Sequence, residues 1–270
     1  MALASRDNKL LVKDGKLCTS CCDDETIGCG GTIKLMSNSG SKVHICFMTN
    51  GETGIEQNSD GSNITQTRMK EAKLAAEYCK KIGIEYSTSV WDVTSAKEII
   101  SINPRMIKVP SACNNNFDML KILRDNYEGD IHISLGMTTN EELKNIISFF
   151  DVKNILKERL IIYACTSGYP VPFDQLCLLE IKKLIDNFGK QVKDVGFSGH
   201  HLGIAADVAA YALGATWIER HFTKDRTWKG TDHAASLEPS GLSKLVRDLD
   251  AVSSSMKYKN DDILEIEKPQ

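Results

Sequence analysis

Apolar and polar positions alternate in blocks along the chain from residue 84 onward. Short apolar runs, which are typical of buried strands, lie at about 84–89, 106–110, 131–134, 160–165, 194–197 and 216–220. Segments with the spacing of amphipathic helices lie between and after them, at about 94–101, 117–126, 139–149, 175–188, 203–213 and 240–255. Strands that alternate with helices in this way predict repeated βα units and a parallel sheet.

The residue types at the helix starts support these boundaries. Thr94 precedes one helical segment, Thr139 is followed by Glu141 and Glu142, and Pro239 lies near the first turn of the last helix. Threonine hydroxyls satisfy free backbone N–H groups at a helix start, and proline suits the first turn. Six βα units in a row, with polar residues at the strand ends, favour a (β/α)8 TIM-type barrel over an open sheet.

Residues 1–82 contain two more segments of each kind. We expect strands at about 16–20 and 42–49 and helices at about 26–37 and 66–82. The stretch 50–65 is rich in Gly, Asn and Ser, which indicates a flexible loop or a linker. Two units plus six make eight, so we expect a complete barrel if the N-terminal units close it and a partial barrel otherwise.

Histidine is concentrated in one part of the chain. Four of the six histidines lie in residues 196–239, and His200 and His221 each follow a predicted strand. The carboxyl ends of strands are where α/β folds bind ligands, so the two imidazoles are expected to meet there. Neutral imidazoles suit a divalent metal such as Mn²⁺, Zn²⁺ or Fe²⁺, although two of them do not select one metal. The pair Asp232 and His233 follows in the same region.

Composition narrows the class of protein. The chain has 26% charged and 41% hydrophobic residues, which is ordinary for a globular protein. A net charge of −3 without a block of lysine or arginine argues against nucleic acid or a membrane surface as the main partner. There is no apolar run of 18 residues and no pattern of a signal peptide, so we expect a cytoplasmic protein that acts on a small molecule.

The nine cysteines are scattered, and most are expected to be reduced thiols. Cys18, Cys21, Cys22 and Cys29 form the one cluster. This cluster lacks the second, distant pair of ligands of a zinc finger, so it is a weak indication of structural zinc.

Six ordered motifs carry a family resemblance. They are YCKKIGIEYSTSVWD (78–92), MIKVPSACNNNFDML (106–120), ISLGMTTNEEL (133–143), YACTSGYPVP (163–172), GFSGHHLGI (196–204) and ERHFTKDRTWKGTDHAASLEP (219–239). With these motifs, residues of about 72–252 resemble the catalytic barrel of the sialic acid synthase family. Enzymes of that family condense phosphoenolpyruvate with N-acetylmannosamine, its 6-phosphate or a related amino sugar.

The resemblance implies roles for particular side chains. It makes His200 and His221 the ligands of a divalent metal, Mn²⁺ or Mg²⁺, which polarises the aldehyde of the open-chain sugar. It gives His201 no role, and we expect that side chain to face solvent. The residues that would bind phosphoenolpyruvate or the amino sugar are Lys108, Ser111, Ser134, Ser167, Tyr169, Ser198 and Asp232, and Lys108 would also be catalytic. A buried phosphate and carboxylate need a cation and several donors of this kind.

The N-terminal part resembles a different family. The stretch CCDDETIGCGGTIKLMSNSGSKVHICFMTNGETG (21–54) is similar to the start of PIG-L/LmbE-type deacetylases, zinc enzymes that remove N-acetyl groups from sugars. This resemblance implies that Asp23 is a general base and Asp24 a Zn²⁺ ligand. Cys21 stands where that family has histidine, and a thiolate can also bind zinc.

The two resemblances divide the chain into a deacetylase-like segment 1–71, a synthase-like barrel 72–256 and a polar tail 257–270. The synthase family's own first two βα units, with their glutamate and Lys-x-Gln motifs, are expected to be missing, as is its C-terminal antifreeze-like domain. We hypothesise that a carboxylate of Asp23, Asp24 or Glu25 replaces the lost glutamate if the two N-terminal units close the barrel. Because a truncated barrel exposes strand edges, we expect a homodimer.

Three functions therefore compete. The first is a metal-assisted synthase that uses phosphoenolpyruvate and an amino sugar, its activity impaired where family residues are missing. The second is a zinc-dependent sugar N-deacetylase. The third is a barrel remnant without catalysis that serves as a binding module.

Overall fold

The computed structural model describes residues 73–81, 83, 85–228, 230 and 232–268, and the backbone of 2–5 and 44–47. The expected strand at 16–20, the helix at 26–37, the loop at 50–65 and the side chains from Cys21 to Glu25 lie outside these described residues.

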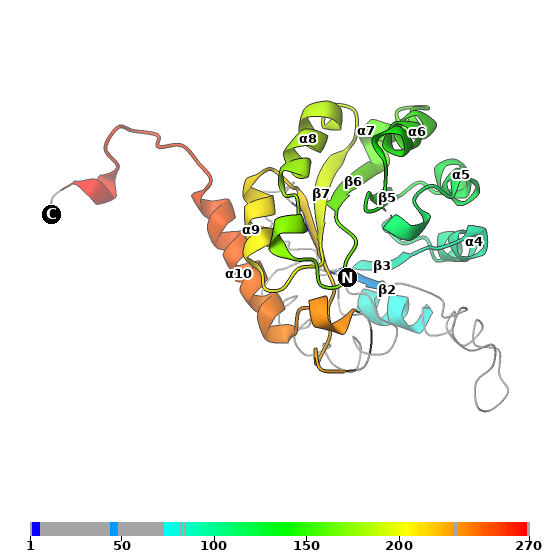
Figure 1. The fold of residues 1–270 in the computed structure, drawn as a ribbon, viewed down its shortest axis with the longest axis horizontal. Coiled ribbons are helices and arrows are strands. Elements are labelled where there is room, and N and C mark those ends of the chain that lie inside the picture. The colour runs from blue at the N-terminus through cyan, green and yellow to red at the C-terminus, as the bar shows by residue number, and fades with distance from the viewer. Residues whose placement is uncertain are drawn as a thin grey trace.

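The centre of the fold is a curled sheet (Figure 1). Its described strands are β1 (Ala2–Ser5), β2 (His44–Phe47), β3 (Glu85–Ser89), β4 (Met106–Val109), β5 (Asp130–Ser134), β6 (Leu160–Cys165), β7 (Asp194–Gly199) and β8 (Trp217–Arg220). Strands β3 to β8 are parallel and follow one another in space as in sequence, which makes a curled half-barrel. Strand β2 pairs with β3 in parallel, whereas β1 pairs with β8 in antiparallel orientation. Strands β1 and β2 also lie close to each other, so the two ends of the sheet approach.

Helices cover the outside of the curved sheet (Figure 1). Among the described residues they include α4 (Val93–Ile102), α5 (Phe117–Asn126), α6 (Asn140–Phe150), α7 (Ile155–Arg159), α8 (Leu179–Phe188), α9 (Ala205–Ala212) and α10 (Pro239–Ser255). Residues 73–81 are also helical. Short 3-10 helices lie at Ser111–Cys113, Phe173–Gln175, His233–Ala235 and Glu265–Glu267.

Side-chain caps explain where two of these helices begin. In α6, Thr139 accepts a hydrogen bond from the backbone N–H of Glu142, whose side chain accepts from the backbone of Thr139 in return. Helix α4 has the same arrangement between Asp92 and Ser95. The cap of α4 is therefore Asp92, and our assignment of that role to Thr94 is wrong because the helix begins at Val93, so Thr94 already lies in its first turn.

The alternation of side chains along the strands produces two apolar cores. Outward residues such as Ile107 and Val109 belong to a large core between the sheet and the helices. Inward residues form a separate small cluster inside the curl: Met106, Ile161, Tyr163 and Trp217. Nearer the carboxyl ends of the strands, the inward positions become polar, and this change creates the candidate site.

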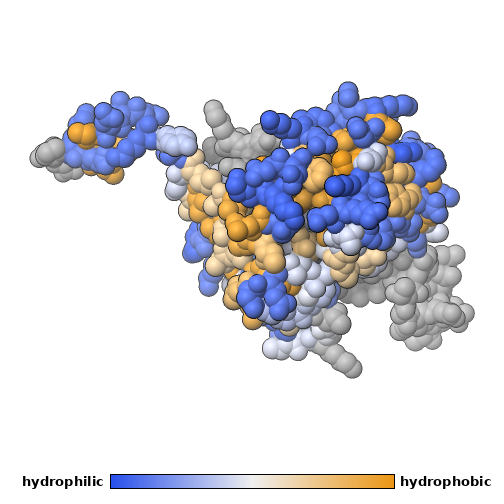
Figure 2. Space-filling view, turned by 45° about the horizontal axis from the view of Figure 1, so that its top comes forward, coloured by the Kyte–Doolittle hydropathy of each residue, from blue (hydrophilic) through white to orange (hydrophobic). Residues whose placement is uncertain are grey.

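The chain after α10 extends away from the body (Figure 1). Figure 2 shows this tail, residues 256–268, as a mostly hydrophilic arm with isolated apolar residues. Tyr258 is 98% exposed and Ile266 is 92% exposed. Its ion pairs join tail residues to one another, as between Lys259 and Glu267 at 2.8 Å.

The six strands and six helices expected after residue 84 are confirmed, with ends that differ by up to about four residues. Helix α7 and the antiparallel strand β1 were not expected. The observed sheet supports a partial TIM-type barrel; closure by N-terminal βα units stays a prediction, since most of 1–72 is outside the described residues. Within the described part of the chain, no helix has the length and apolar character needed to cross a membrane.

Candidate active site

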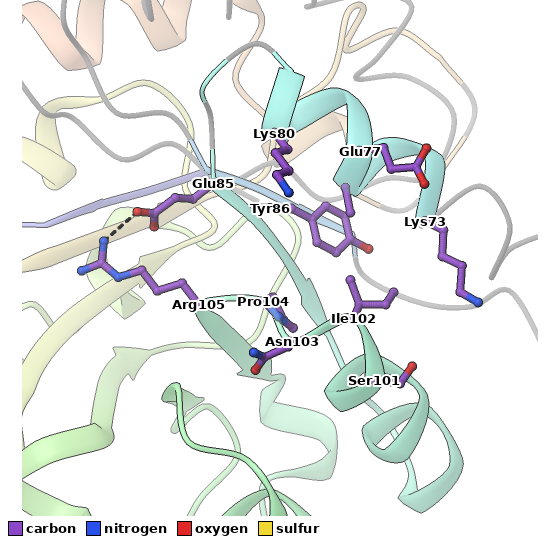
Figure 3. Close-up of a pocket in the computed structure, with 11 residues that line it drawn as sticks. Lys73, Glu77, Lys80, Glu85, Tyr86, Ser101, Ile102, Asn103, Pro104 and Arg105 are labelled. Carbon is purple, nitrogen blue, oxygen red and sulfur yellow. Dashed lines mark hydrogen bonds and ion pairs between the residues drawn. The ribbon is translucent and has the colours of Figure 1, made fainter.

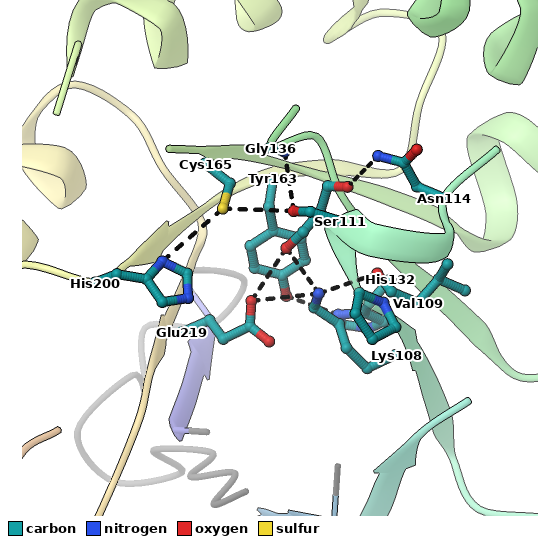
Figure 4. A network of polar contacts seen from close by, with 12 residues as sticks. Lys108, Val109, Ser111, Asn114, His132, Gly136, Tyr163, Cys165, His200 and Glu219 are labelled. Carbon is teal, nitrogen blue, oxygen red and sulfur yellow. Dashed lines mark hydrogen bonds and ion pairs between the residues drawn. The ribbon is translucent and has the colours of Figure 1, made fainter. Parts of the chain in front are cut away.

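Inward side chains from successive strands meet at the carboxyl end of the curled sheet (Figure 4). Lys108 lies on β4 and Ser134 at the end of β5. Ser198 lies near the end of β7, and His200 and His221 directly follow β7 and β8. Their positions alternate with outward apolar residues, so a period of two places all five on one face of the sheet. Each of these five side chains is at most 2% exposed.

Lys108 is the centre of a polar network (Figure 4). Its Nζ donates to Ser134 Oγ at 2.7 Å and to the carbonyl of Val109 at 3.1 Å. The same Nζ lies 3.5 Å from Oε2 of Glu219, and Ser134 Oγ donates to this oxygen at 3.3 Å. Oε1 of Glu219 is buried and has no hydrogen-bond partner among the described residues. A charged lysine inside the curl is thus balanced by a carboxylate that keeps one oxygen for a further donor.

Ser111 lies beside this network, on the loop after β4. Its Oγ accepts a hydrogen bond from the backbone N–H of Gly136 at 3.0 Å and approaches Cys165 Sγ at 3.6 Å. A Cβ added to Gly136 would lie 2.7 Å from Ser111 Oγ and 2.3 Å from Ser167 Oγ. Glycine is therefore required here, because only it lets both serine hydroxyls approach the end of β5.

His200 and His221 face each other. Their ring centroids are 5.0 Å apart, and the ring of Tyr169 stands edge-on to both, at 4.7 Å and 5.6 Å. His200 Nδ1 is 3.9 Å from Cys165 Sγ. The expected meeting of the two histidines at neighbouring strand ends is therefore confirmed by the geometry.

Both imidazoles are held in the neutral form. Burial lowers the pKa of His200 from its ordinary 6.5 to about 3, and the charges of Lys108 and Arg220 act in the same direction. Burial also lowers the pKa of His221 well below its ordinary value, with a further contribution from His200. Neutral imidazole nitrogens are the form that binds metals.

A divalent metal fits these two side chains. Nε2 of His200 is buried and has no hydrogen-bond partner among the described residues, so its lone pair or proton is unsatisfied there. In the described part of the chain, however, no group of three or more His, Cys, Asp or Glu side chains gathers around a metal position. A metal held here would therefore take two ligands from the described residues, His200 and His221, and would need further oxygen ligands from elsewhere.

Asp232 approaches this pair from the loop after β8. Its Oδ2 lies 3.8 Å from His221 Nδ1, and its side chain is 44% exposed. The neighbouring His233 turns to another partner, since its Nδ1 is 2.8 Å from Thr223 Oγ1. Asp232, like Tyr169, is thus a half-exposed group near the buried histidines, at the mouth of the site.

The structure corrects one expectation. His201 does not face solvent: its side chain is fully buried, 3.3 Å from Asp207 and 3.3 Å from Arg220. The reason is that His201 follows His200 and points to the outer side of the sheet, where α9 covers it.

The sequence interpretation also missed Glu219, Arg220, Asp207 and Cys165. Glu219 has a signal that period-two counting could have found, because it lies two residues before His221 on the same strand. Cys165 likewise precedes Ser167 by two residues. The partnership of Arg220 with Asp207 had no local signal, because it joins a strand to a helix.

Two of the cavities in the described part of the chain lie near opposite ends of the strands. One, of about 580 Å³, opens between α6 and α8 and is lined by Cys165, Ser167 and Thr138 among others. The other, of about 480 Å³, lies at the amino ends of β3 and β4, where Glu85 and Arg105 form an ion pair of 2.8 Å (Figure 3). Only the first adjoins the candidate site, since catalytic groups of such barrels lie at the carboxyl ends.

The curled parallel sheet and the polar cluster at its carboxyl ends define an α/β protein of the TIM-barrel class with a candidate active site. The chain belongs to the NeuB family, whose family model matches residues 34–261.

Several relatives have been named for their activity. The chain is 35% identical to N-acetylneuraminate-9-phosphate synthase of Mus musculus over 186 residues, which cover 68% of this chain and 50% of the relative. It is 30% identical to N,N'-diacetyllegionaminic acid synthase of Campylobacter jejuni over 203 residues, covering 73% of this chain and 60% of the relative. The chain thus spans about half the length of the curated relatives it matches.

Solved structures agree on the fold. N-acetylneuraminic acid synthetase from Leptospira borgpetersenii serovar Hardjo-bovis superposes with a TM-score of 0.74 at 23% identity, covering 93% of this chain and 87% of that one. A DAHP synthase from Thermotoga maritima has a TM-score of 0.67 at 14% identity, covering 90% and 69%. Both support the barrel-like architecture.

The family match begins inside the segment that we assigned to a deacetylase-like beginning. The deacetylase resemblance of 17–71 and the absence of the synthase family's first two units both stay predictions, as does the division of the chain into three segments.

Proposed function

We propose that this chain is a phosphoenolpyruvate-dependent synthase that makes a nonulosonic acid of the sialic acid type from an amino sugar. The observation that carries the proposal is the convergence of Lys108 with His200 and His221 at the carboxyl end of the sheet, in a chain of the NeuB family. This class of activity is supported by relatives that are named as synthases of three different nonulosonic acids.

In this proposal, phosphoenolpyruvate lies over the Lys108 network. The ammonium of Lys108 neutralises part of the ligand's negative charge, and the hydroxyls of Ser111 and Ser198 donate to its phosphate and carboxylate oxygens. Ser134 would donate as well once its O–H turns from Glu219 to the ligand. Desolvation by the surrounding barrel strengthens these contacts, because the buried groups have little water to compete with them. The Glu219 carboxylate balances the charge of Lys108 and fixes its position.

The acceptor sugar is assigned to the mouth of the site. Ser167 and Tyr169 lie on the loop after β6, and Asp232 lies on the loop after β8. A half-exposed tyrosine ring and a carboxylate are suited to the apolar face and the hydroxyls of a sugar. N-acetylmannosamine, its 6-phosphate or a related amino sugar would fit this chemistry.

His200 and His221 are proposed to hold a divalent metal, Mn²⁺ or Mg²⁺. Such a metal supplies Lewis acidity at the sugar's aldehyde oxygen. The chain's own contribution is to keep both imidazoles neutral by burial and to orient them through the ring of Tyr169.

The proposed reaction forms a bond between C3 of phosphoenolpyruvate and the aldehyde carbon of the sugar. Water then adds at C2, and phosphate leaves with cleavage of the C2–O bond. Lys108 and the serines stabilise the charge that develops on the phosphate. Oε1 of Glu219, which is buried beside Lys108, is positioned to accept a hydrogen bond from the attacking water.

Two further parts of the proposal concern the rest of the molecule. The carboxylates of Asp23, Asp24 and Glu25 are proposed to complete the acidic side of the site; they lie outside the described residues. A homodimer is proposed because β1 and β2, which end the described sheet, approach each other without pairing, and unpaired strand edges favour association.

The test is an assay with two readouts. The protein is incubated with phosphoenolpyruvate, Mn²⁺ and N-acetylmannosamine or its 6-phosphate, and released phosphate and released acetate are measured separately. Phosphate release that is lost in His200→Ala and His221→Ala supports the synthase. Acetate release that depends on Zn²⁺ would favour a deacetylase instead. A folded protein that binds phosphoenolpyruvate but gives neither product would favour a binding module.

Lys108→Met and Lys193→Met form a matched pair for the same assay. Lys193 pairs with Asp130 at the amino end of β5, away from the candidate site. Phosphate release should be lost with Lys108→Met and kept with Lys193→Met. Equal loss in both would contradict a specific role for Lys108.

A further inference from the structure

We propose that Arg220, Asp207 and His201 form a buried clamp that positions His200 and His221 for metal binding. All three clamp residues are positioning residues, since they lie on the outer side of the sheet and do not face the site. The inference goes beyond the proposed function but rests on it in one respect, the metal role of the two histidines.

Arg220 is the centre of the clamp. Its Nη1 donates to Oδ2 of Asp207 at 2.5 Å and to the carbonyl of Gly203 at 2.7 Å. Its Nη2 donates to the carbonyl of His201 at 2.6 Å and to that of Ala235 at 3.2 Å. One guanidinium thus joins β8 to helix α9, to the loop after β7 and to the loop that precedes α10.

The clamp residues are fully desolvated. Arg220 is 1% exposed, and Asp207 and His201 are 0% exposed. His201 Nε2 lies 3.3 Å from both Arg220 Nη1 and Asp207 Oδ2, so the imidazole is part of the same network. A buried charge pair contributes little net stability compared with apolar residues of the same shape. We therefore take its role here to be the fixing of side-chain positions.

Covalent geometry connects the clamp to the candidate metal ligands. Arg220 is bonded directly to His221, and His201 is bonded directly to His200. Because successive residues of an extended chain point to opposite sides, fixing the outward residue fixes the inward one. The clamp joins these two outward residues and so determines the separation of the inward histidines, whose ring centroids are 5.0 Å apart.

Gly199 gives independent support for this close arrangement. A Cβ at that position would lie 2.9 Å from Cε1 of His201 and 3.1 Å from Cδ of Arg220. It would also lie 2.8 Å from the ring of Phe197. The strand end therefore has room for both clamp side chains only because residue 199 has none.

An arginine is required by the number and direction of the acceptors. Three carbonyl oxygens and a carboxylate surround the two terminal nitrogens of Arg220. A planar guanidinium can donate to them at once, whereas a lysine ammonium has three donors on a single atom. Arg220→Lys therefore keeps the charge beside Asp207 but loses contacts to the loops.

The experiment compares Arg220→Lys and Asp207→Asn with wild type and with the matched control Arg247→Lys, which lies exposed on α10. Mn²⁺ binding is measured by electron paramagnetic resonance, and phosphoenolpyruvate binding without metal is measured by calorimetry. Imidazole NMR signals of metal-free protein are assigned with His200→Gln and His221→Gln. Circular dichroism identifies the variants that are folded.

We expect Arg220→Lys to weaken Mn²⁺ binding about tenfold or more, with phosphoenolpyruvate affinity almost unchanged and the imidazole signals of His200 and His221 shifted or doubled. Arg247→Lys should match wild type in every measurement. A general loss of stability would weaken the binding of Mn²⁺ and of phosphoenolpyruvate together. A loss of Mn²⁺ binding alone therefore indicates a specific effect on the histidines.

The proposal is overturned if folded Arg220→Lys and Asp207→Asn bind Mn²⁺ like wild type and keep both imidazole signals. If wild type itself binds no Mn²⁺, the metal part of the proposed function fails. The clamp is then judged by the imidazole signals alone, and unchanged signals in both variants overturn it.

Discussion

Lys108 and Glu219 are both inside the curled sheet, 1% and 0% exposed, and each balances the other's charge. Lys108→Met leaves the carboxylate without its cation, so we expect unfolding free energy to fall by about 3–5 kcal/mol. Urea unfolding at neutral pH measures this change. The double variant Lys108→Met with Glu219→Gln removes both charges and should recover part of the loss. Equal loss in the single and double variants would contradict the pairing.

Because His200 and His221 are buried in the neutral form, we expect the unfolding free energy to fall at acidic pH. In the unfolded chain each takes up a proton near its ordinary pKa of 6.5, whereas burial keeps the folded pKa of His200 at about 3 and that of His221 also low. The unfolded state therefore binds more protons as the pH falls below about 6.5, and stability declines by about 1.4 kcal/mol per pH unit for each histidine. Above that pH the two groups contribute no slope.

Urea unfolding of metal-free protein between about pH 7 and pH 5 measures this slope. The double variant His200→Gln with His221→Gln has no imidazole at either position and should have a shallower slope over this range. If the double variant kept the full slope of wild type, other groups would be responsible for the acid sensitivity.

At the residue scale, the sequence identified some of the inward polar residues and missed others, such as Glu219. His200 and His221 were predicted because they follow predicted strands, and Lys108 was predicted from the family resemblance. Arg220 is buried beside His221, yet its partner Asp207 lies on α9. Contacts between a helix and a strand depend on how the helix packs on the sheet. The local pattern of apolar and polar residues carries no information about that packing.

At the scale of elements, the strands were predicted more accurately than the helix ends. Strand β6 was expected at 160–165 and lies at Leu160–Cys165, because a run of buried apolar residues marks both of its ends. Helix α8 begins at Leu179 instead of near residue 175, since a 3-10 turn at Phe173–Gln175 uses the preceding residues. The short helix α7 has only five residues, too few for the periodic pattern to identify it.

The capping box of α6 predicts a local effect of Thr139→Ala. The change leaves the backbone N–H of Glu142 without its acceptor, and we expect a loss of about 1 kcal/mol in unfolding free energy. Lys144→Ala, at an exposed position of the same helix, is the control and should change stability little. Urea unfolding measures both variants, and an equal effect of the two would show that the cap contributes nothing.

At the scale of the whole molecule, the order of elements along the chain predicts the fold class. It does not predict which strands lie at the two ends of the sheet. Repeated βα units predict parallel strands with short connections, which β3 to β8 confirm. Strand β1 pairs in the opposite direction with β8, far away in sequence, and a residue pattern near one terminus carries no information about such a partner. This pairing places the N-terminus of the sheet beside the strand that carries Glu219.

The two ends of the chain should therefore respond differently to truncation. Removing residues 1–5 takes away the backbone partners of Trp217 to Arg220, and each lost hydrogen bond costs about 0.5–1.5 kcal/mol. Removing residues 257–270 takes away a tail that is exposed and bonded mainly to itself, so Tm should change little.

Calorimetry compares the two truncated chains with the full chain, and hydrogen exchange follows the amides of β8. Faster exchange in β8 after the first truncation but not after the second is the expected result, because β1 is the described strand that covers the outer edge of β8. Unchanged exchange in both would mean that β8 is held by β7 alone.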